Sequence, residues 1–149
     1  GLCNTLRTAG HPVHLETSGT LFQEVDADLI CISPKLRNST PDEILYPEWH
    51  VRHETSRLRP GVLRQFMERW PVETHLKFVV NSDEEIREAR EIVDEIHFQD
   101  KSRVFLMPQA RNLQELTEKA PEVVAWALRE GFRYSDRLQL RLWDGEHGR

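Results

Sequence analysis

The sequence has 149 residues, a formal charge of −5 and an apolar fraction of 38%. This length supports one domain, predicted to span residues 1–149, and allows roughly two-thirds of the unfolded surface to be buried. The acidic balance excludes a chain-wide basic field for nucleic acid. Because of this charge, we expect no nucleic-acid partner. No run of about 18 apolar residues occurs, so we also expect no membrane partner.

The cysteines of the sequence are Cys3 and Cys31. Two thiols cannot form the disulfide scaffold of a small secreted protein, which favours a reducing, cytoplasmic compartment. They also cannot hold a cluster that needs three or four thiolates. Two histidine pairs with a two-residue gap have no third ligand at suitable spacing, so we expect packed or solvent-facing histidines and no metal site. The pairs are His11 with His14 and His50 with His53.

Five short apolar runs predict strands. They occupy residues 13–15, 29–32, 76–80, 104–107 and 138–142. The middle three runs are continuous rather than alternating, as expected for strands buried on both faces of a parallel sheet.

Helical patterns lie between these runs. Ser82 and Glu85 form a capping box at the start of one predicted helix. Its apolar face is formed by Ile86, Ala89, Val93 and Ile96. Another predicted helix spans residues 62–70 and is stopped by Pro71. The polar, proline-punctuated residues 37–59 before it are predicted to form a loop or excursion outside the core.

A further helix is predicted to start near Asn112, with Glu115 three residues later, and to end at Gly131. Pro121 lies inside this pattern and predicts a kink or two abutting helices. The apolar face of this pattern contains Leu116, Ala120, Val124, Ala127 and Leu128.

The alternation of strands and helices predicts right-handed parallel βα units, as in a doubly wound sheet or part of a barrel. Functional groups of such sheets gather at the carboxyl ends of the strands. Four of the predicted strands are followed by short polar groups with Gly or Pro, at residues 16–20, 33–35, 81–82 and 108–110. This composition fits the rim of a pocket for a polar small molecule, although each exit alone also fits ordinary turn and cap residues.

At these exits the sequence resembles the 7-carboxy-7-deazaguanine synthase family. The resemblance lies in residues 15–20, 28–36, 76–80, 105–108 and 131–143, the last of which is similar to the closing strand of the family. It implies an α/β fold, namely a partial (βα) barrel of the radical S-adenosylmethionine type with parallel strands and flanking helices. Members of the family are lyases of queuosine biosynthesis that convert 6-carboxy-5,6,7,8-tetrahydropterin to 7-carboxy-7-deazaguanine. They use S-adenosylmethionine, a four-iron four-sulfur cluster and magnesium.

The resemblance also implies roles for individual residues. One set would contact S-adenosylmethionine, and a hydroxyl and a cation at the second exit suit its ribose and carboxylate groups. This set comprises Ser33, Pro34, Lys35, Met107, Pro108, Gln109 and Ala110. Glu16 would face the reaction centre and contact the pterin substrate.

The sequence departs from the family in lacking its cysteine motif and its Gly-Gly-Glu-Pro segment, and Cys3 and Cys31 do not replace the cluster ligands. Residues 1–9 resemble the helix after that segment, and the chain starts at Gly1 without a methionine. We therefore expect a truncated barrel without its first two strands, catalytically inactive when alone. The alternatives are a non-catalytic binding protein that kept the fold, or another radical S-adenosylmethionine enzyme. An unpaired edge at residues 13–15 predicts a homodimer or aggregation.

Overall fold

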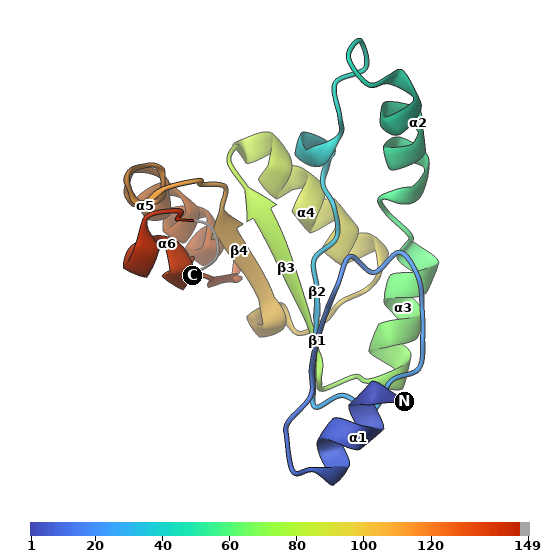
Figure 1. Ribbon diagram of the computed structural model, residues 1–149. Helices are drawn as coiled ribbons and strands as arrows, with labels where there is room; N and C mark the ends of the chain where they lie inside the picture. Colours follow the sequence, from blue (N-terminus) through green and yellow to red (C-terminus); the bar gives the residue numbers. More distant parts are fainter. Residues whose placement is uncertain (147–149) are drawn as a thin grey trace.

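The computed structural model describes residues 1–146, and residues 147–149 of the predicted domain lie outside this part. Its centre is a parallel sheet with strand order β1-β2-β3-β4-β5 (Figure 1). The strands are β1 His14–Thr17, β2 Leu29–Ile32, β3 Thr74–Val80, β4 Val104–Pro108 and β5 Arg133–Tyr134. The expected α/β class with parallel strands is therefore confirmed.

The connections between the strands contain most of the helices. These are α1 Leu2–Thr8, α2 Pro47–Ser56, α3 Pro60–Arg69, α4 Asp83–Glu95, α5 Leu113–Glu130 and α6 Leu138–Trp143, with short 3-10 turns η1 Arg37–Ser39 and η2 Lys101–Arg103. Apolar side chains of α3, α4 and α5 join the strands in one core cluster, for example Phe66, Ile92 and Trp126. Within residues 1–146, no helix has the length and apolar character needed to cross a membrane.

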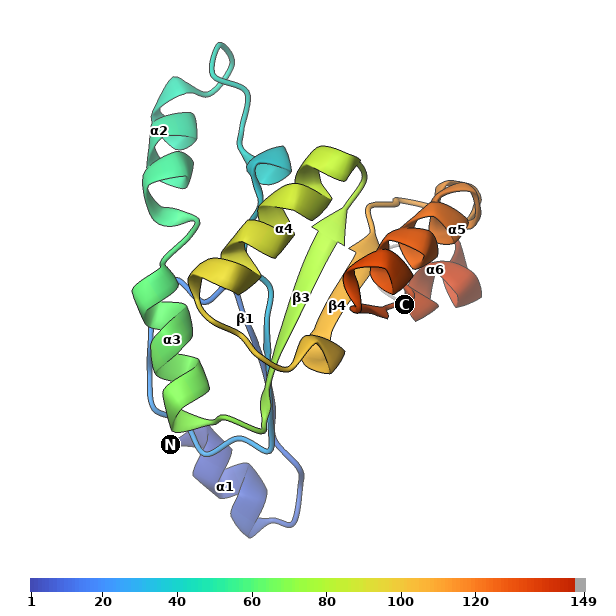
Figure 2. The same ribbon diagram turned by 180° about the vertical axis from the view of Figure 1, so that it is seen from behind.

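The helices of residues 1–146 cover only one face of the sheet. The strands lie in front of α4 in Figure 1, and α4 lies in front of β3 in the reverse view of Figure 2. Along β3 and β4, buried residues such as Phe78 and Leu106 alternate with half-buried residues such as Val79 and Phe105. The prediction that these strands are buried on both faces is therefore wrong. Their continuous apolar pattern includes side chains that no described element covers.

The helix starts predicted at Ser82 and near Asn112 are confirmed by their caps, whereas α3 starts at Pro60, two residues before the predicted start, and has no side-chain cap. The hydroxyl of Ser82 accepts a hydrogen bond from the amide of Glu85, and the carboxylate of Glu85 accepts one from the amide of Asn81. At α5, the side-chain oxygen of Asn112 accepts a hydrogen bond of 2.8 Å from the amide of Glu115. Capping of this kind satisfies amides that have no partner within the helix.

The end of α5 is also as predicted, because Gly131 follows it with a φ of 73°, a left-handed conformation that glycine adopts readily. Pro121 does not divide the helix, since α5 runs through it as one element. The predicted apolar face holds for Leu116, which is fully buried, but not for Leu128, which is 77% exposed.

The fifth predicted strand, residues 138–142, is wrong: these residues form α6, and the last strand is β5. The alternating leucines do not form one face of a strand. Leu140 alone is buried, against Ala110 and Leu116, whereas Leu138 and Leu142 are exposed. Asp136 helps to fix the helical turn, because its carboxylate accepts hydrogen bonds of 2.8 Å from the amide of Arg137 and from Nε of Arg141.

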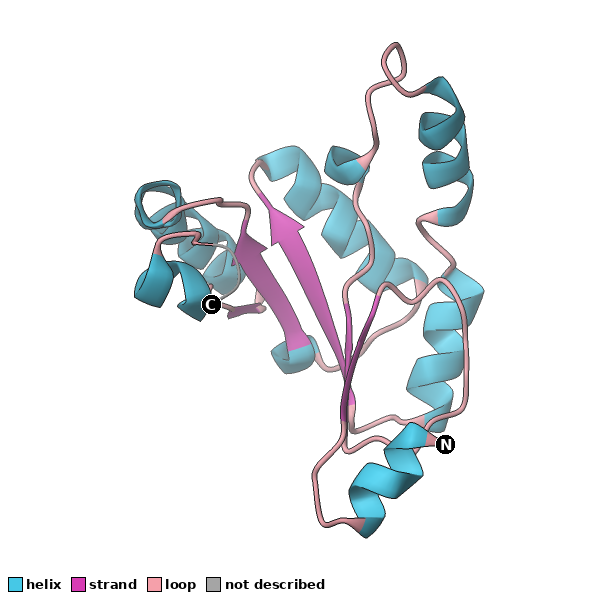
Figure 3. Ribbon diagram, in the orientation of Figure 1, coloured by secondary structure: helices cyan, strands magenta, loops and turns pink. Residues whose placement is uncertain are grey.

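Residues 37–59 form an excursion, as predicted, but one that contains η1 and α2. Helix α2 contributes no buried residue and stands apart from the sheet (Figure 3). The outer part of the excursion, which comprises the start of α2 and the residues just before it, has exposed apolar side chains, namely Ile44, Leu45, Tyr46, Trp49 and Val51. Polar contacts at its inner end, described below, connect the excursion to the rest of the molecule.

Candidate functional site

Two neighbouring cavities lie at the carboxyl edge of the sheet. The first, which we call the β2 cavity, has a volume of 210 Å³ and is lined by Ser33, Pro34, Lys35, Leu36, Asn38, Ser39, Val79 and Gln109. The second, the β4 cavity, has a volume of 390 Å³ and is lined by Asn81, Gln109, Ala110, Arg111, Glu115, Glu118 and Lys119. Gln109 belongs to both linings, so the two cavities meet at this residue.

The β2 cavity is built where β2 ends. The amide of Ser33 donates a hydrogen bond of 2.7 Å to the carbonyl oxygen of Thr17, which continues the parallel ladder for one residue. Pro34 is buried, whereas Lys35 is exposed. The side-chain amide of Asn38 donates a hydrogen bond of 3.3 Å to the carbonyl oxygen of Val79 and so ties the loop to β3. A serine and a lysine therefore line the same small cavity.

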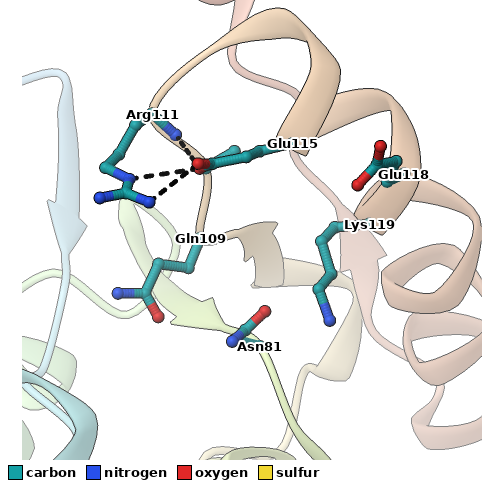
Figure 4. Close-up of a pocket in the computed structure, with 7 residues that line it drawn as sticks. Asn81, Gln109, Arg111, Glu115, Glu118 and Lys119 are labelled. Atoms are coloured by element: carbon teal, nitrogen blue, oxygen red, sulfur yellow. Dashed lines mark hydrogen bonds and ion pairs between the residues drawn. The ribbon is translucent and has the colours of Figure 1, made fainter.

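The β4 cavity contains both charges and amides (Figure 4). Arg111 and Glu115 form an ion pair of 2.9 Å on its rim, and the hydrogen bond from Arg111 lowers the pKa of the Glu115 carboxyl. The side chains of Asn81, after β3, and Lys119, on α5, extend towards the same space in Figure 4. Such a mixture of donors and acceptors suits a polar ligand rather than an apolar one.

The uncovered face of the sheet contains a third polar cluster. Nζ of Lys77 on β3 lies 3.0 Å from Oε1 of Glu16 at the end of β1. Cys31 is in register with Glu16, and its strand, β2, lies between β1 and β3. Burial raises the pKa of the Cys31 thiol, and the nearby Lys77 ammonium opposes this effect. The cluster joins three adjacent strands through side chains.

The structure brings some of the predicted site residues together and leaves others apart. Ser33, Pro34, Lys35 and Gln109 line the β2 cavity, and Ala110 lines the β4 cavity. Three predicted residues line neither cavity. Met107 is half-buried and pairs with Val79, Pro108 is buried, and the Glu16 side chain is 73% exposed on the uncovered face. The roles assigned to all of these residues by resemblance stay predictions.

Sequence reasoning missed several lining residues. Asn38 and Ser39 lie in the excursion that was predicted to be outside the core, and no local pattern shows that this segment folds back beside the exit of β2. Arg111 and Glu115 carry a signal that could have been used, since opposite charges four residues apart pair at a helix start. Their proximity to Gln109 follows from the short turn between β4 and α5.

The residues present do not fit a four-iron four-sulfur cluster. Such clusters are held by cysteine thiolates, and the sequence has only Cys3, on α1, and Cys31, on β2. Residues 1–146 also contain no group of three or more His, Cys, Asp or Glu side chains placed to hold a metal ion. The polar cavities, in contrast, are lined by residues that carry hydroxyl, amide and ammonium groups, which can bind a small polar ligand.

The fold and the cavities together define an α/β protein with polar cavities at the carboxyl edge of a parallel sheet. Three curated relatives, all 7-carboxy-7-deazaguanine synthases, are similar to the chain. The protein of Rhodopirellula baltica is 35% identical over 99% of this chain and 56% of its own length. The protein of Halobacterium salinarum is 32% identical over 96% of this chain and 58% of its own length. The protein of Pyrobaculum aerophilum is 29% identical over 99% of this chain and 59% of its own length.

By sequence, almost the whole chain is similar to one part of the 7-carboxy-7-deazaguanine synthases. It spans a little over half the length of these relatives, between 56% and 59%. The family resemblance seen at the strand exits is therefore confirmed over almost the whole chain. No protein-family model matches the sequence, and no solved structure gives a significant match.

Proposed function

We propose that the chain supplies the S-adenosylmethionine-binding part of a 7-carboxy-7-deazaguanine synthase. The observation that best supports this proposal is that the exits of β2 and β4 meet at one cavity, where Ser33, Lys35 and Gln109 are neighbours. Parallel α/β sheets bind ligands at this edge. The family relationship supplies the identity of the ligand.

The lining residues have suitable chemistry for this ligand. The Lys35 ammonium is exposed and can bind the carboxylate of S-adenosylmethionine, while the Ser33 hydroxyl can donate to or accept from the ribose. The Gln109 amide offers both a donor and an acceptor for a nucleoside. The β2 cavity alone is smaller than most ligand pockets, and the adjoining β4 cavity provides the additional room.

The proposed activity of the complete protein is the conversion of 6-carboxy-5,6,7,8-tetrahydropterin to 7-carboxy-7-deazaguanine in queuosine biosynthesis, with magnesium and with Glu16 near the substrate. An iron–sulfur cluster would supply the electron that cleaves S-adenosylmethionine. Because Cys3 and Cys31 do not form a cluster site, we propose that this chain alone binds the ligand without cleaving it.

Titration calorimetry with S-adenosylmethionine tests the proposal. We expect the wild-type chain to bind, and Lys35→Met to bind about tenfold more weakly, because a hydrogen bond to a charged group contributes about 1.5–3 kcal/mol. Lys101→Met is the matched control, since Lys101 lies in η2 near the Phe132 ring and lines neither cavity. Absence of binding by the wild-type chain, or equal binding by the Lys35→Met variant, would contradict the proposal.

A second experiment addresses the reaction. The chain is incubated anaerobically with iron, sulfide, a reductant and S-adenosylmethionine, and the products are separated by chromatography. We expect no reductive cleavage, whereas cleavage above the protein-free control would show that the chain is active alone.

The second candidate is a non-catalytic binding protein that kept the fold, and the cysteine count favours it equally. The genomic DNA upstream of the codon for Gly1 separates the two candidates. An in-frame cysteine motif there supports the synthase, and a start codon at that position supports the binding protein. Calorimetry with a pterin carboxylate then tests whether the substrate side of the site has been kept.

A further inference from the structure

Arg57 lines neither cavity, yet its side chain contacts the wall of the β2 cavity from outside. Nη1 of Arg57 donates hydrogen bonds of 2.8 Å to the carbonyl oxygen of Lys35 and 2.7 Å to Oε1 of Glu88, and Nε donates one of 3.0 Å to Oε1 of Glu54. These partners belong to the β2 exit, to α4 and to α2. We propose that Arg57 is a positioning residue that fixes the Lys35 loop for ligand binding.

Burial makes this contact strong. Arg57 is only 8% exposed although it carries a full charge, and the Glu88 side chain that pairs with it is 18% exposed. A buried charge is stable only when it is paired and hydrogen-bonded. The planar guanidinium meets three acceptors in different directions at once, which a lysine ammonium or an apolar side chain does not reproduce.

The same network continues along the cavity wall. The second carboxylate oxygen of Glu88 accepts a hydrogen bond of 3.0 Å from the amide of Arg37. His53, on the inner side of α2, forms hydrogen bonds of 3.2 Å with the hydroxyls of Ser39 and Thr40. The backbone from Lys35 to Thr40 is therefore fastened at several points by α2 and α4.

This arrangement gives the excursion a role. Its outer part exposes apolar side chains and adds nothing to the core, whereas its last residues return to hold the exit of β2. The inference rests on the proposed function, because the loop that Arg57 fixes is the loop assigned to S-adenosylmethionine. Its structural part, that Arg57 orders residues 33–40, does not depend on the identity of the ligand.

The test compares Arg57→Met and Arg57→Lys with Arg103→Met. Arg103 is a matched control because it also fastens backbone carbonyls, those of Pro71 and Thr74, but at the opposite edge of the sheet. Two measurements are made on each variant: hydrogen exchange of the amides in residues 33–40, followed by mass spectrometry, and the Kd for S-adenosylmethionine by calorimetry.

We expect Arg57→Met to accelerate exchange in residues 33–40 and to weaken binding by about tenfold, the effect of losing one charge-assisted hydrogen bond. Arg57→Lys should show smaller changes in both exchange and binding than Arg57→Met. It also keeps the test possible if Arg57→Met does not fold. Arg103→Met should lower the melting temperature but leave both quantities within about twofold of the wild type. A common increase in exchange for all variants, or wild-type exchange in both Arg57 variants, would overturn the inference. If the wild-type chain itself does not bind, the proposed function fails, and the exchange comparison still decides the role of Arg57.

Discussion

The Lys77 ammonium lies 3.0 Å from the Glu16 carboxylate, although β2 separates the strands that carry them. The Lys77 side chain therefore crosses β2 at the level of Cys31. This crossing explains why Lys77 is only 19% exposed on a face that no described helix covers. Its aliphatic part lies on the sheet, and its charge is neutralised by Glu16.

The reactivity of Cys31 measures this arrangement. Lys77→Met removes a cation that lowers the thiol pKa, so the pKa rises further and less thiolate is present at pH 8. We expect alkylation of Cys31 by iodoacetamide to slow by about threefold or more, because one pKa unit changes the thiolate fraction by about tenfold. Peptide mass spectrometry follows Cys31, with Cys3 as internal reference. Lys77→Arg keeps the charge and should alter the rate little; a faster rate in Lys77→Met would contradict the arrangement.

Gly19 occupies a position that other residues do not tolerate. Its φ is +73°, and an added Cβ would lie 2.5 Å from Cδ2 of Leu63 and 2.6 Å from Cγ2 of Ile32. Left-handed strain and overpacking together predict that Gly19→Ala lowers the free energy of unfolding by about 2–4 kcal/mol. Urea denaturation measures the loss.

Gly61 provides the control for this substitution. It lies in the first turn of α3, and an added Cβ would meet nothing within 4 Å. Gly61→Ala should therefore raise the free energy of unfolding by about 0.4–1 kcal/mol. Equal effects at Gly19 and Gly61 would show that the loop after β1 is not packed as described.

Two leucines of α5 lie on different faces of this helix, one buried and one exposed. Leu116 is fully buried with Ala110 and Leu140, whereas Leu128 is exposed. Leu116→Ala is expected to cost about 2–5 kcal/mol, and Leu128→Ala less than about 0.5 kcal/mol. Chemical denaturation of both variants tests the packing of α6 on α5, because a small loss at Leu116 would mean that α6 does not cover it.

Asp28 predicts a pH dependence of stability. Its carboxylate accepts a hydrogen bond of 2.8 Å from the amide of Val13 and another from Arg7, and these interactions lower its pKa, that from Val13 most strongly. A lowered pKa in the folded state contributes stability that is complete above the unfolded value of about 3.9 and is lost as the pH falls through the folded value. The urea midpoint should fall more between pH 6 and pH 3 in the wild type than in Asp28→Asn. Parallel curves for the two proteins would refute this role of Asp28.

The edge of β1 predicts self-association. Among the described strands, β1 pairs only with β2, so its other edge offers unpaired backbone groups. We expect sedimentation velocity to give a mass that increases with protein concentration, through a homodimer or larger species. A constant monomer mass over a hundredfold concentration range would argue against pairing through this edge.

The features that the sequence predicted correctly depend on neighbouring residues. The capping interactions at Ser82 and Asn112, the stop at Gly131 and the apolar runs of β2 to β4 all have local causes. The strand predicted at residues 138–142 failed because its alternating leucines satisfy a strand pattern, while the ion pair between Asp136 and Arg141 favours a helical turn. Hydrophobic periodicity does not detect such a contact.

The candidate site shows the same division. The exits of β2 and β4 could be placed at one edge because parallel strands end together. Arg57 and Asn38 could not be assigned to it, since they reach it through an excursion whose path has no signature in the local sequence. Glu16 lies within β1 and lines neither cavity, and its pairing with Lys77 could not be predicted without the strand order.

The one-sided sheet gives adjacent residues of one strand different selective constraints. In β3, Leu76 and Phe78 are enclosed by the core, while Lys77 and Val79 face outward. Substitutions of Leu76 or Phe78 change the stability of the fold. Substitutions of Lys77 or Val79 change the surface that is available for binding. A mutational scan of β3 that is scored for protein abundance should therefore be sensitive at every second codon. When the variants that remain folded are scored for ligand binding, the sensitive codons should be the other ones.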